Sequence, residues 1–104
     1  YVRRLIKAYR KTPGTTGRVH RQDRRFAEQL YELQVPLAAV ENALLLASAR
    51  RSFRPNNAPH LETIRSLYYF RSVIDEVMQS TMSDDYFCYL RRKLEAIHKQ
   101  HPGQ

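Results

Sequence analysis

The sequence predicts an all-α fold, a compact bundle of about five helices, from three observations. Apolar residues recur at three- and four-residue spacing in five segments, and no segment alternates apolar and polar residues as a half-buried strand does. The 104 residues include only three glycines and five prolines, too few for a loop-rich all-β fold of this size. Hydrophobic residues make up 42% of the chain and charged residues 27%, the proportions of a folded globular domain.

The first predicted helix spans residues 2–11 and the second spans residues 20–33. Between them, Pro13 and Gly14 stop a helix. The second helix is expected to end just before Pro36, because a residue that precedes proline avoids the helical conformation. The apolar faces of the two helices comprise Val2, Leu5, Ile6, Tyr9, Phe26, Ala27, Leu30, Tyr31 and Leu33.

The third predicted helix, residues 36–52, is apolar on nearly every face and is therefore expected to be central and buried. Residues 53–59 contain prolines and asparagines and are predicted to form a loop. The fourth helix is predicted over residues 60–79, and the fifth over residues 84–98 with Ser83 as its N-cap. The predicted core comprises Phe26, Leu30, Val40, Leu44, Ile64, Leu67, Ile74, Tyr86, Leu90 and Leu94.

A single domain is expected over residues 1–104, with a strongly basic N-terminal helix and loop in residues 1–25 and the helical core in residues 26–101. Because the chain begins with Tyr1 instead of Met, we interpret it as excised from a longer protein, which leaves a preceding domain open. Cys88 is the only cysteine, so we expect a reducing compartment, the cytoplasm. No apolar run approaches the ~18–20 residues of a membrane span, so no membrane partner is expected.

The positive charge of the chain is concentrated in residues 1–25. This segment carries nine Lys and Arg residues and one acidic residue, Asp23, while the other 79 residues sum to zero, so the segment accounts for the whole net charge of +8. A charge confined to one segment is typical of a surface that binds a polyanion, and nucleic acid is the default polyanion. The predicted nucleic-acid-binding residues are Arg3, Arg4, Lys7, Arg10, Lys11, Arg18, Arg21, Arg24 and Arg25, with Arg50, Arg51, Arg54, Arg91 and Arg92 as candidates for a second contact line.

Two features near this segment bear on the same prediction. The linker at residues 12–17 (TPGTTG) supplies hydroxyls and unhindered backbone amides, which are good phosphate partners. Arg21, Arg24 and Arg25 oppose the dipole at the start of the second helix, an unfavourable placement that favours a functional use. The alternative interpretation is a solvated basic face, or one that docks on an acidic protein.

The second and third predicted helices have the proportions of a helix-turn-helix hairpin, with a tight joint at residues 33–36. The second helix of that motif normally presents polar side chains to base edges in the major groove. Residues 36–52 instead offer mainly leucine, valine and alanine. Two core helices with an ordinary joint are therefore the favoured interpretation, and no base-sequence specificity is predicted.

Tyr68, Tyr69 and Phe70, flanked by Arg65 and Arg71, alternate aromatic and basic residues as single-strand-binding proteins do. Core packing is the favoured role for these rings, because they lie inside an apolar helix pattern. For Tyr69 the sequence does not decide between core packing and base stacking, since this residue falls outside the main apolar stripe.

No catalytic residue, metal site, cofactor or small-molecule substrate is predicted. Asp75 and Glu76 are adjacent in the sequence, so their side chains diverge around a helix, and the pair at residues 84–85 is explained by helix capping. His98 and His101 lack a cysteine or an acidic residue that would complete a metal site.

Residues 26–51 (FAEQLYELQVPLAAVENALLLASARR) and 64–76 (IRSLYYFRSVIDE) resemble helical modules of bacterial plasmid and mobile-element replication initiators. Their rhythm is similar to that of the C-terminal DnaD-like domain of replication-restart proteins, in which a helix pair ends in a basic residue and the next helix carries an aromatic pair, here Tyr69 and Phe70. The resemblance covers about half the chain. It implies a DNA-binding or protein-docking accessory role in bacterial replication or transposition. The alternative to nucleic-acid binding is a small subunit that docks on an acidic partner or within a larger nucleoprotein complex.

Overall fold

A computed structural model describes residues 1–54, 59, 61–79 and 84–100 of the chain. These residues form five α-helices and one short 3-10 helix, with no strand among them, so the predicted all-α fold is confirmed. The elements in chain order are α1 (Val2–Lys11), α2 (Arg21–Glu32), α3 (Leu37–Ser52), η1 (Leu67–Phe70), α4 (Arg71–Gln79) and α5 (Asp84–Gln100). The predicted N-cap Ser83, residues 55–58 of the predicted loop and residue 101 of the predicted histidine pair lie outside the described residues.

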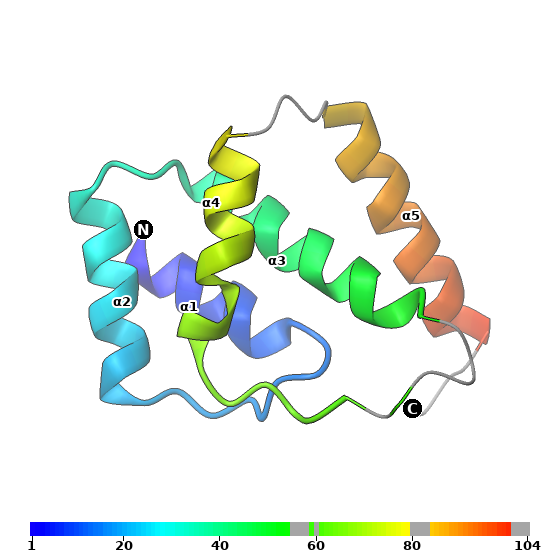
Figure 1. Cartoon of the computed structure of the whole chain (residues 1–104), viewed down its shortest axis with the longest axis horizontal. Coiled ribbons are helices and arrows are strands. Elements are labelled where there is room, and N and C mark those ends of the chain that lie inside the picture. The colour runs from blue at the N-terminus through cyan, green and yellow to red at the C-terminus, as the bar shows by residue number, and fades with distance from the viewer. Residues whose placement is uncertain (55–58, 60, 80–83, 101–104) are drawn as a thin grey trace.

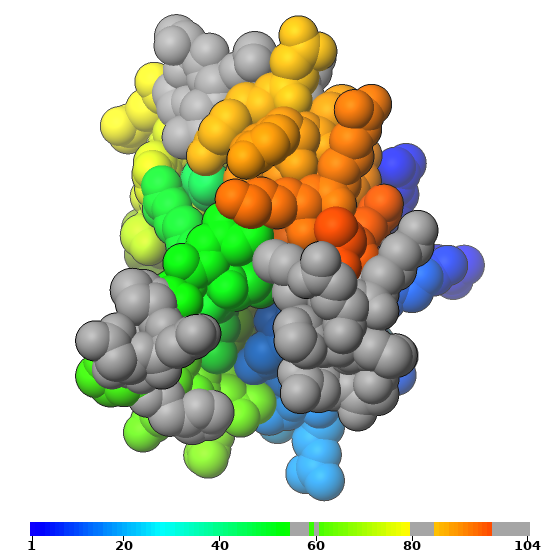
Figure 2. All heavy atoms as spheres, turned by 90° about the vertical axis from the view of Figure 1, so that its right-hand side faces the viewer, coloured from blue at the N-terminus to red at the C-terminus, as the bar shows by residue number. Residues whose placement is uncertain are grey.

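Helix α3 runs through the middle of the molecule and contacts α1, α4, α5 and η1 (Figure 1). Helix α2 packs on α1 and η1 at one end, and α5 lies along α3 at the other. In the view of Figure 2, α5 faces the reader, with side chains of α1 protruding at one edge and those of α4 at the opposite edge. Helices α1 and α4 therefore cover opposite sides of α3.

The sequence of α3 accounts for its central position. Its buried residues lie on most of its circumference, as expected for a helix that is apolar on nearly every face. Ser48 is polar and 4% exposed, and its hydroxyl donates to the carbonyl oxygen of Leu44 at 2.8 Å, which satisfies it inside the core. Pro36 is the N-cap residue, where its missing N–H costs no hydrogen bond.

Within the described residues the core consists of two clusters, which pack against different faces of α3. The larger joins α1, α2, α3, Ile64, η1 and α4. The smaller joins α3 to Phe87, Leu90 and Leu94 of α5. The prediction that Tyr86 is a core residue is wrong: Tyr86 is 42% exposed and Phe87 is 5% exposed. The spacing 87–90–94 follows one helix face, whereas residue 86 lies at its edge.

The predicted fourth helix begins too early. Residues 61–66 are not helical, and the 3-10 turn η1 precedes α4. The N–H of Ile64 donates to the carbonyl oxygen of Gly14 at 2.7 Å, and the N–H of Thr16 donates to that of Ile64 at 3.0 Å. These long-range bonds hold residue 64 in a β-bridge with Thr15, so its backbone groups are satisfied outside a helix.

Two further residues of the predicted apolar faces are exposed. Leu33 is 74% exposed and Tyr31 61% exposed, although both were expected to lie on the buried face of the second helix. Helix α2 ends at Glu32, and Gln34 turns the chain with a φ of 61°. Leu33 is the C-cap residue, so it leaves the face that carries Phe26 and Leu30 into the core.

Candidate nucleic-acid interface

Helix α1 divides cleanly into an apolar inner face and a basic outer face. Leu5, Ile6 and Tyr9 are buried against the rest of the domain. The basic side chains of the helix are exposed; they are Arg3, Arg4, Lys7, Arg10 and Lys11. At a rise of about 1.5 Å per residue, the line of cations from residue 3 to residue 11 extends about 12 Å.

The N-terminus of α2 is organised by a buried carboxylate. Asp23 is 1% exposed, and its Oδ2 accepts a hydrogen bond from the backbone N–H of His20, the N-cap residue, at 2.8 Å. His20 Nδ1 lies 3.6 Å from the same oxygen. An acidic residue three positions after the N-cap satisfies a helix-terminal donor and suits the helix dipole. Asp23 therefore offsets part of the unfavourable placement of the neighbouring arginines.

Asp23 also fixes α2 against η1. Its Oδ1 accepts hydrogen bonds from the backbone N–H of Leu67 at 2.9 Å and from the hydroxyl of Ser66 at 3.4 Å. Sequence reasoning counted Asp23 only as a charge and missed this role. The signal that could have found it is the capping spacing between residues 20 and 23; its partners 43 and 44 residues away leave no local pattern.

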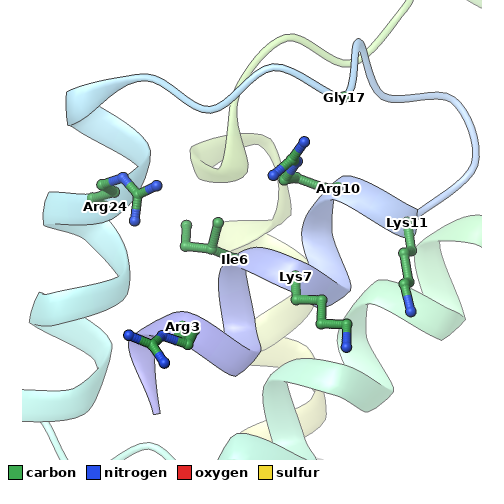
Figure 3. A pocket seen from close by; sticks show the side chains of 7 residues that line it. All are labelled: Arg3, Ile6, Lys7, Arg10, Lys11, Gly17 and Arg24. Carbon is green, nitrogen blue, oxygen red and sulfur yellow. The ribbon is translucent and has the colours of Figure 1, made fainter.

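Helices α1 and α2 together form a basic groove with a volume of about 740 Å³. Figure 3 shows Arg24 extending from α2 toward α1 and Arg3 extending from α1 toward α2, with Ile6 between them. We call this surface the basic groove; its lining residues are Arg3, Ile6, Lys7, Arg10, Lys11, Gly17 and Arg24. Five of these seven side chains are cations, and all five were predicted site residues.

The cations of the basic groove are not neutralised by the described part of the chain. No described carboxylate forms an ion pair with any of the five; the pairs present are Arg4–Glu41, His20–Asp23 and Arg50–Glu76. All five side chains are exposed. Like charges that line one groove repel one another, and an anion bound in the groove relieves that repulsion.

The loop between α1 and α2 forms one end of the basic groove through Gly17, whose φ is 76°. Two hydroxyls expected to contact phosphate are used inside the loop. Thr12 Oγ1 donates to the carbonyl oxygen of Ala8 at 2.8 Å, and Thr15 Oγ1 donates to that of Thr12 at 2.9 Å. These threonines shape the loop, and the cations remain the groups in the groove able to bind an anion.

The other predicted residues of the N-terminal segment lie outside the basic groove. Arg18, Arg21 and Arg25 are exposed and do not line it. Arg4 lies 3.4 Å from Glu41 of α3 through its Nη2, which balances its charge.

The predicted second contact line does not form one continuous surface. Arg50 donates two hydrogen bonds to the carboxylate of Glu76, one of them at 2.8 Å. The hydrogen bond raises the pKa of the Arg50 guanidinium and lowers the pKa of the Glu76 carboxyl. Arg51 donates to the carbonyl oxygen of Glu62 at 2.9 Å and so holds the segment before η1. Arg54 lines a separate hollow of about 400 Å³ with these two arginines.

Arg91 lies beside Lys11 of the basic groove. It lines a hollow of about 520 Å³ between α1, α3 and α5, and Lys11 lines both this hollow and the basic groove. Glu41 and Glu95 also line the hollow, so two carboxylates lie beside its two cations. Arg92, one position further on, is exposed and does not line it. The concentrated positive charge therefore ends at Lys11.

The aromatic residues of η1 divide between core and surface. Phe70 is fully buried, as predicted, whereas Tyr68 is 55% exposed and Tyr69 50% exposed. The centres of the Tyr68 and Phe26 rings lie 5.2 Å apart. The Arg71 guanidinium lies 5.4 Å from the centre of the Tyr68 ring and donates a hydrogen bond to the Tyr68 hydroxyl. The prediction that Tyr68 packs in the core is therefore wrong.

Two further observations on the described residues concern a metal site and a membrane-spanning helix. No group of three or more His, Cys, Asp or Glu side chains within residues 1–54, 59, 61–79 and 85–96 is placed to hold a metal ion. In the same part of the chain, no helix is both long enough and apolar enough to cross a membrane.

The fold and the groove define an all-α domain with one concentrated basic surface. No protein-family model matches the chain, and neither a curated protein nor a solved structure shows significant similarity to it.

Proposed function

We propose that this protein is a non-catalytic nucleic-acid-binding module that contacts phosphates, those of DNA in preference to RNA, through its basic N-terminal surface. The observation that carries the proposal is the basic groove, which five exposed cations from two helices line without an ion-pair partner among the described residues. A phosphodiester chain is a regular line of negative charges, and neutralising it releases condensed counterions, which favours binding.

The setting that we propose is a bacterial replication or mobile-element system in the cytoplasm. It rests on the resemblance of residues 26–51 and 64–76 to replication-initiator modules and on the single cysteine. The groove itself supports only the contact with phosphates.

Fluorescence anisotropy with labelled duplex DNA, single-stranded DNA and RNA, each at several salt concentrations, tests the proposal. If about four or five phosphates are neutralised, log K for duplex DNA should fall with log salt with a slope of about −4. Substitution of Arg24→Glu should weaken binding at least tenfold while the far-ultraviolet circular dichroism stays helical, because the Arg24 side chain is exposed and forms no hydrogen bond or ion pair with the described residues.

The matched control is Arg65→Glu, which makes the same change in charge at an exposed residue outside the basic groove. It should weaken binding much less than Arg24→Glu. Equal losses in the two variants would show that net charge, and not the groove, governs binding. An absence of salt-dependent binding to any nucleic acid would overturn the proposal in favour of docking on an acidic protein.

A further inference from the structure

A second hollow continues the seam between α1 and α2 beyond the basic groove. Its volume is about 400 Å³, and we call it the tyrosine hollow; its lining residues are Tyr1, Tyr31, Glu32, Gln34, Val35, Pro36 and Leu37. Arg3 lines the basic groove, and Tyr1, two residues earlier, lines the tyrosine hollow, so the two sites meet near the start of α1. A ligand that extends along this seam from the basic groove therefore reaches the tyrosine hollow.

Helix α2 presents one face to both sites. Tyr31 follows Arg24 by seven residues, which is about two turns of an α-helix, so the two side chains leave the same face about 10 Å apart along the axis. Arg24 extends toward α1 (Figure 3). The Tyr31 ring contacts the ring of Tyr1, the N-cap residue of α1, with 5.3 Å between the ring centres. An aromatic ring thus lies in line with the cations of the basic groove.

The chemistry of the tyrosine hollow differs from that of the basic groove. Its lining residues include no lysine, arginine or histidine, and the carboxylate of Glu32 disfavours a phosphate there. They instead offer aromatic rings, apolar side chains and the amide of Gln34. Proteins bind unpaired bases by stacking them on aromatic rings and by hydrogen bonds from amide and carboxylate groups to the base edges. The tyrosine hollow therefore suits the uncharged base of a nucleotide, whereas the basic groove suits its phosphate.

The Tyr31 ring is accessible and rests on a fixed support. It is 61% exposed, so much of its surface is free to contact a ligand. Tyr1, Val35 and Leu37 are partly buried and pack against the larger core cluster, so the domain holds the side chains around Tyr31 in place. A tyrosine has only two side-chain torsions, and a ring that is already positioned loses little entropy when it binds.

We infer that the tyrosine hollow binds an unpaired base of the nucleic-acid strand whose phosphates occupy the basic groove, with the base stacked on Tyr31. This inference rests on the proposed function and adds a base-binding site to its phosphate contacts. Gln34 supplies the amide that donates to or accepts from the edge of the base. Because the bases of a duplex are paired and stacked inside it, the ligand that fills both sites is single-stranded.

Anisotropy with a single-stranded DNA oligonucleotide and an abasic one of the same length isolates the contribution of the bases, because both carry the same phosphates. The wild-type protein should bind the intact strand at least about fivefold more tightly, the low end for one base stacked on an aromatic ring. Tyr31→Ala should remove this preference and leave the affinities for the abasic strand and for a blunt DNA duplex within about twofold of wild type. Tyr31→Phe keeps the ring and should retain the preference.

The matched control is Tyr89→Ala, which removes a similarly exposed tyrosine from α5, outside both sites. It should leave all three affinities within about twofold of wild type, and the circular dichroism of each variant should stay helical because both tyrosines are exposed.

Equal binding of intact and abasic strands by the wild type would overturn the inference while leaving the proposed function standing, since phosphate contacts alone would then account for binding. A preference that survives Tyr31→Ala would also overturn it. So would a loss in Tyr31→Ala that extends equally to the abasic strand or the duplex, or an equal loss in Tyr89→Ala. Failure of every probe to bind would contradict the proposed function itself.

Discussion

The carboxylate of Asp23 accepts a hydrogen bond from the backbone N–H of Leu67, 44 residues further along the chain, at 2.9 Å. The same carboxylate accepts from the N–H of His20 at the start of α2. One side chain thus joins the N-terminus of α2 to the turn that precedes α4. Because Arg24 follows Asp23 directly, this contact also fixes the wall of the basic groove that faces α1.

Replacing Asp23 with alanine should destabilise the domain strongly. The substitution leaves the N–H groups of His20 and Leu67 without their acceptor, and Leu67 is fully buried. Loss of a charged, buried hydrogen-bond acceptor and a helix cap should lower the free energy of unfolding by about 2–4 kcal/mol. Urea denaturation followed by circular dichroism measures the change. Asp75→Ala, at an exposed position of α4, should cost less than about 0.5 kcal/mol; similar losses in both variants would contradict the role of Asp23.

The predicted and observed folds differ mainly where distant segments meet. The central position of α3 could be predicted because its apolar character extends around the helix within one continuous segment. The non-helical conformation of residues 61–66 could not be predicted, because it depends on backbone hydrogen bonds that Ile64 donates to Gly14 and accepts from Thr16, about 50 residues away. Among the site residues, the basic face of α1 could be predicted from the spacing of its cations. That Arg50 and Arg51 do not extend this face could not be predicted, because it depends on their partners Glu76 and Glu62 in distant segments.

Tyr9 carries a buried hydroxyl that has no hydrogen-bond partner among the described residues. Burial, and secondarily the charge of Asp23, raises its pKa above the ordinary value of 10.0. Tyr9→Phe removes the unsatisfied group and keeps the ring that packs edge-on against Phe70. The free energy of unfolding at neutral pH should therefore rise by about 1 kcal/mol.

The same substitution should alter the alkaline limb of the stability curve. Above pH 10.0 the unfolded chain loses the Tyr9 proton before the folded chain does, so the wild-type protein loses stability as pH rises toward the folded pKa. Tyr9→Phe lacks this loss, and its advantage over the wild type should grow above pH 10.0. Denaturation midpoints measured at neutral and alkaline pH provide the comparison, and a lower stability of Tyr9→Phe at both would show that its hydroxyl is satisfied.

The ion pair between Arg50 and Glu76 predicts a pH dependence on the acid side. Its hydrogen bond lowers the folded pKa of Glu76 below the ordinary value of 4.5. The contribution of the pair to stability is therefore present above pH 4.5 and is lost as pH falls through the folded pKa, because the unfolded chain takes up the proton first. The difference in unfolding free energy between wild type and Glu76→Gln should shrink across this window. A difference that is constant with pH would mean that the pair contributes no electrostatic stabilisation.

Gly14 and Gly17 give a matched test of the loop that closes the basic groove. Both have positive φ, 89° and 76°, so alanine at either position strains the backbone by about 1–2 kcal/mol. A Cβ on Gly17 would meet nothing within 4 Å, whereas one on Gly14 would lie 3.0 Å from Arg51 Nε, part of the side chain that holds the Glu62 carbonyl. Gly14→Ala should therefore lower the free energy of unfolding more than Gly17→Ala. If the two variants unfold at the same denaturant concentration, the Arg51 side chain moves aside without cost, and its contact with the loop does not contribute to stability.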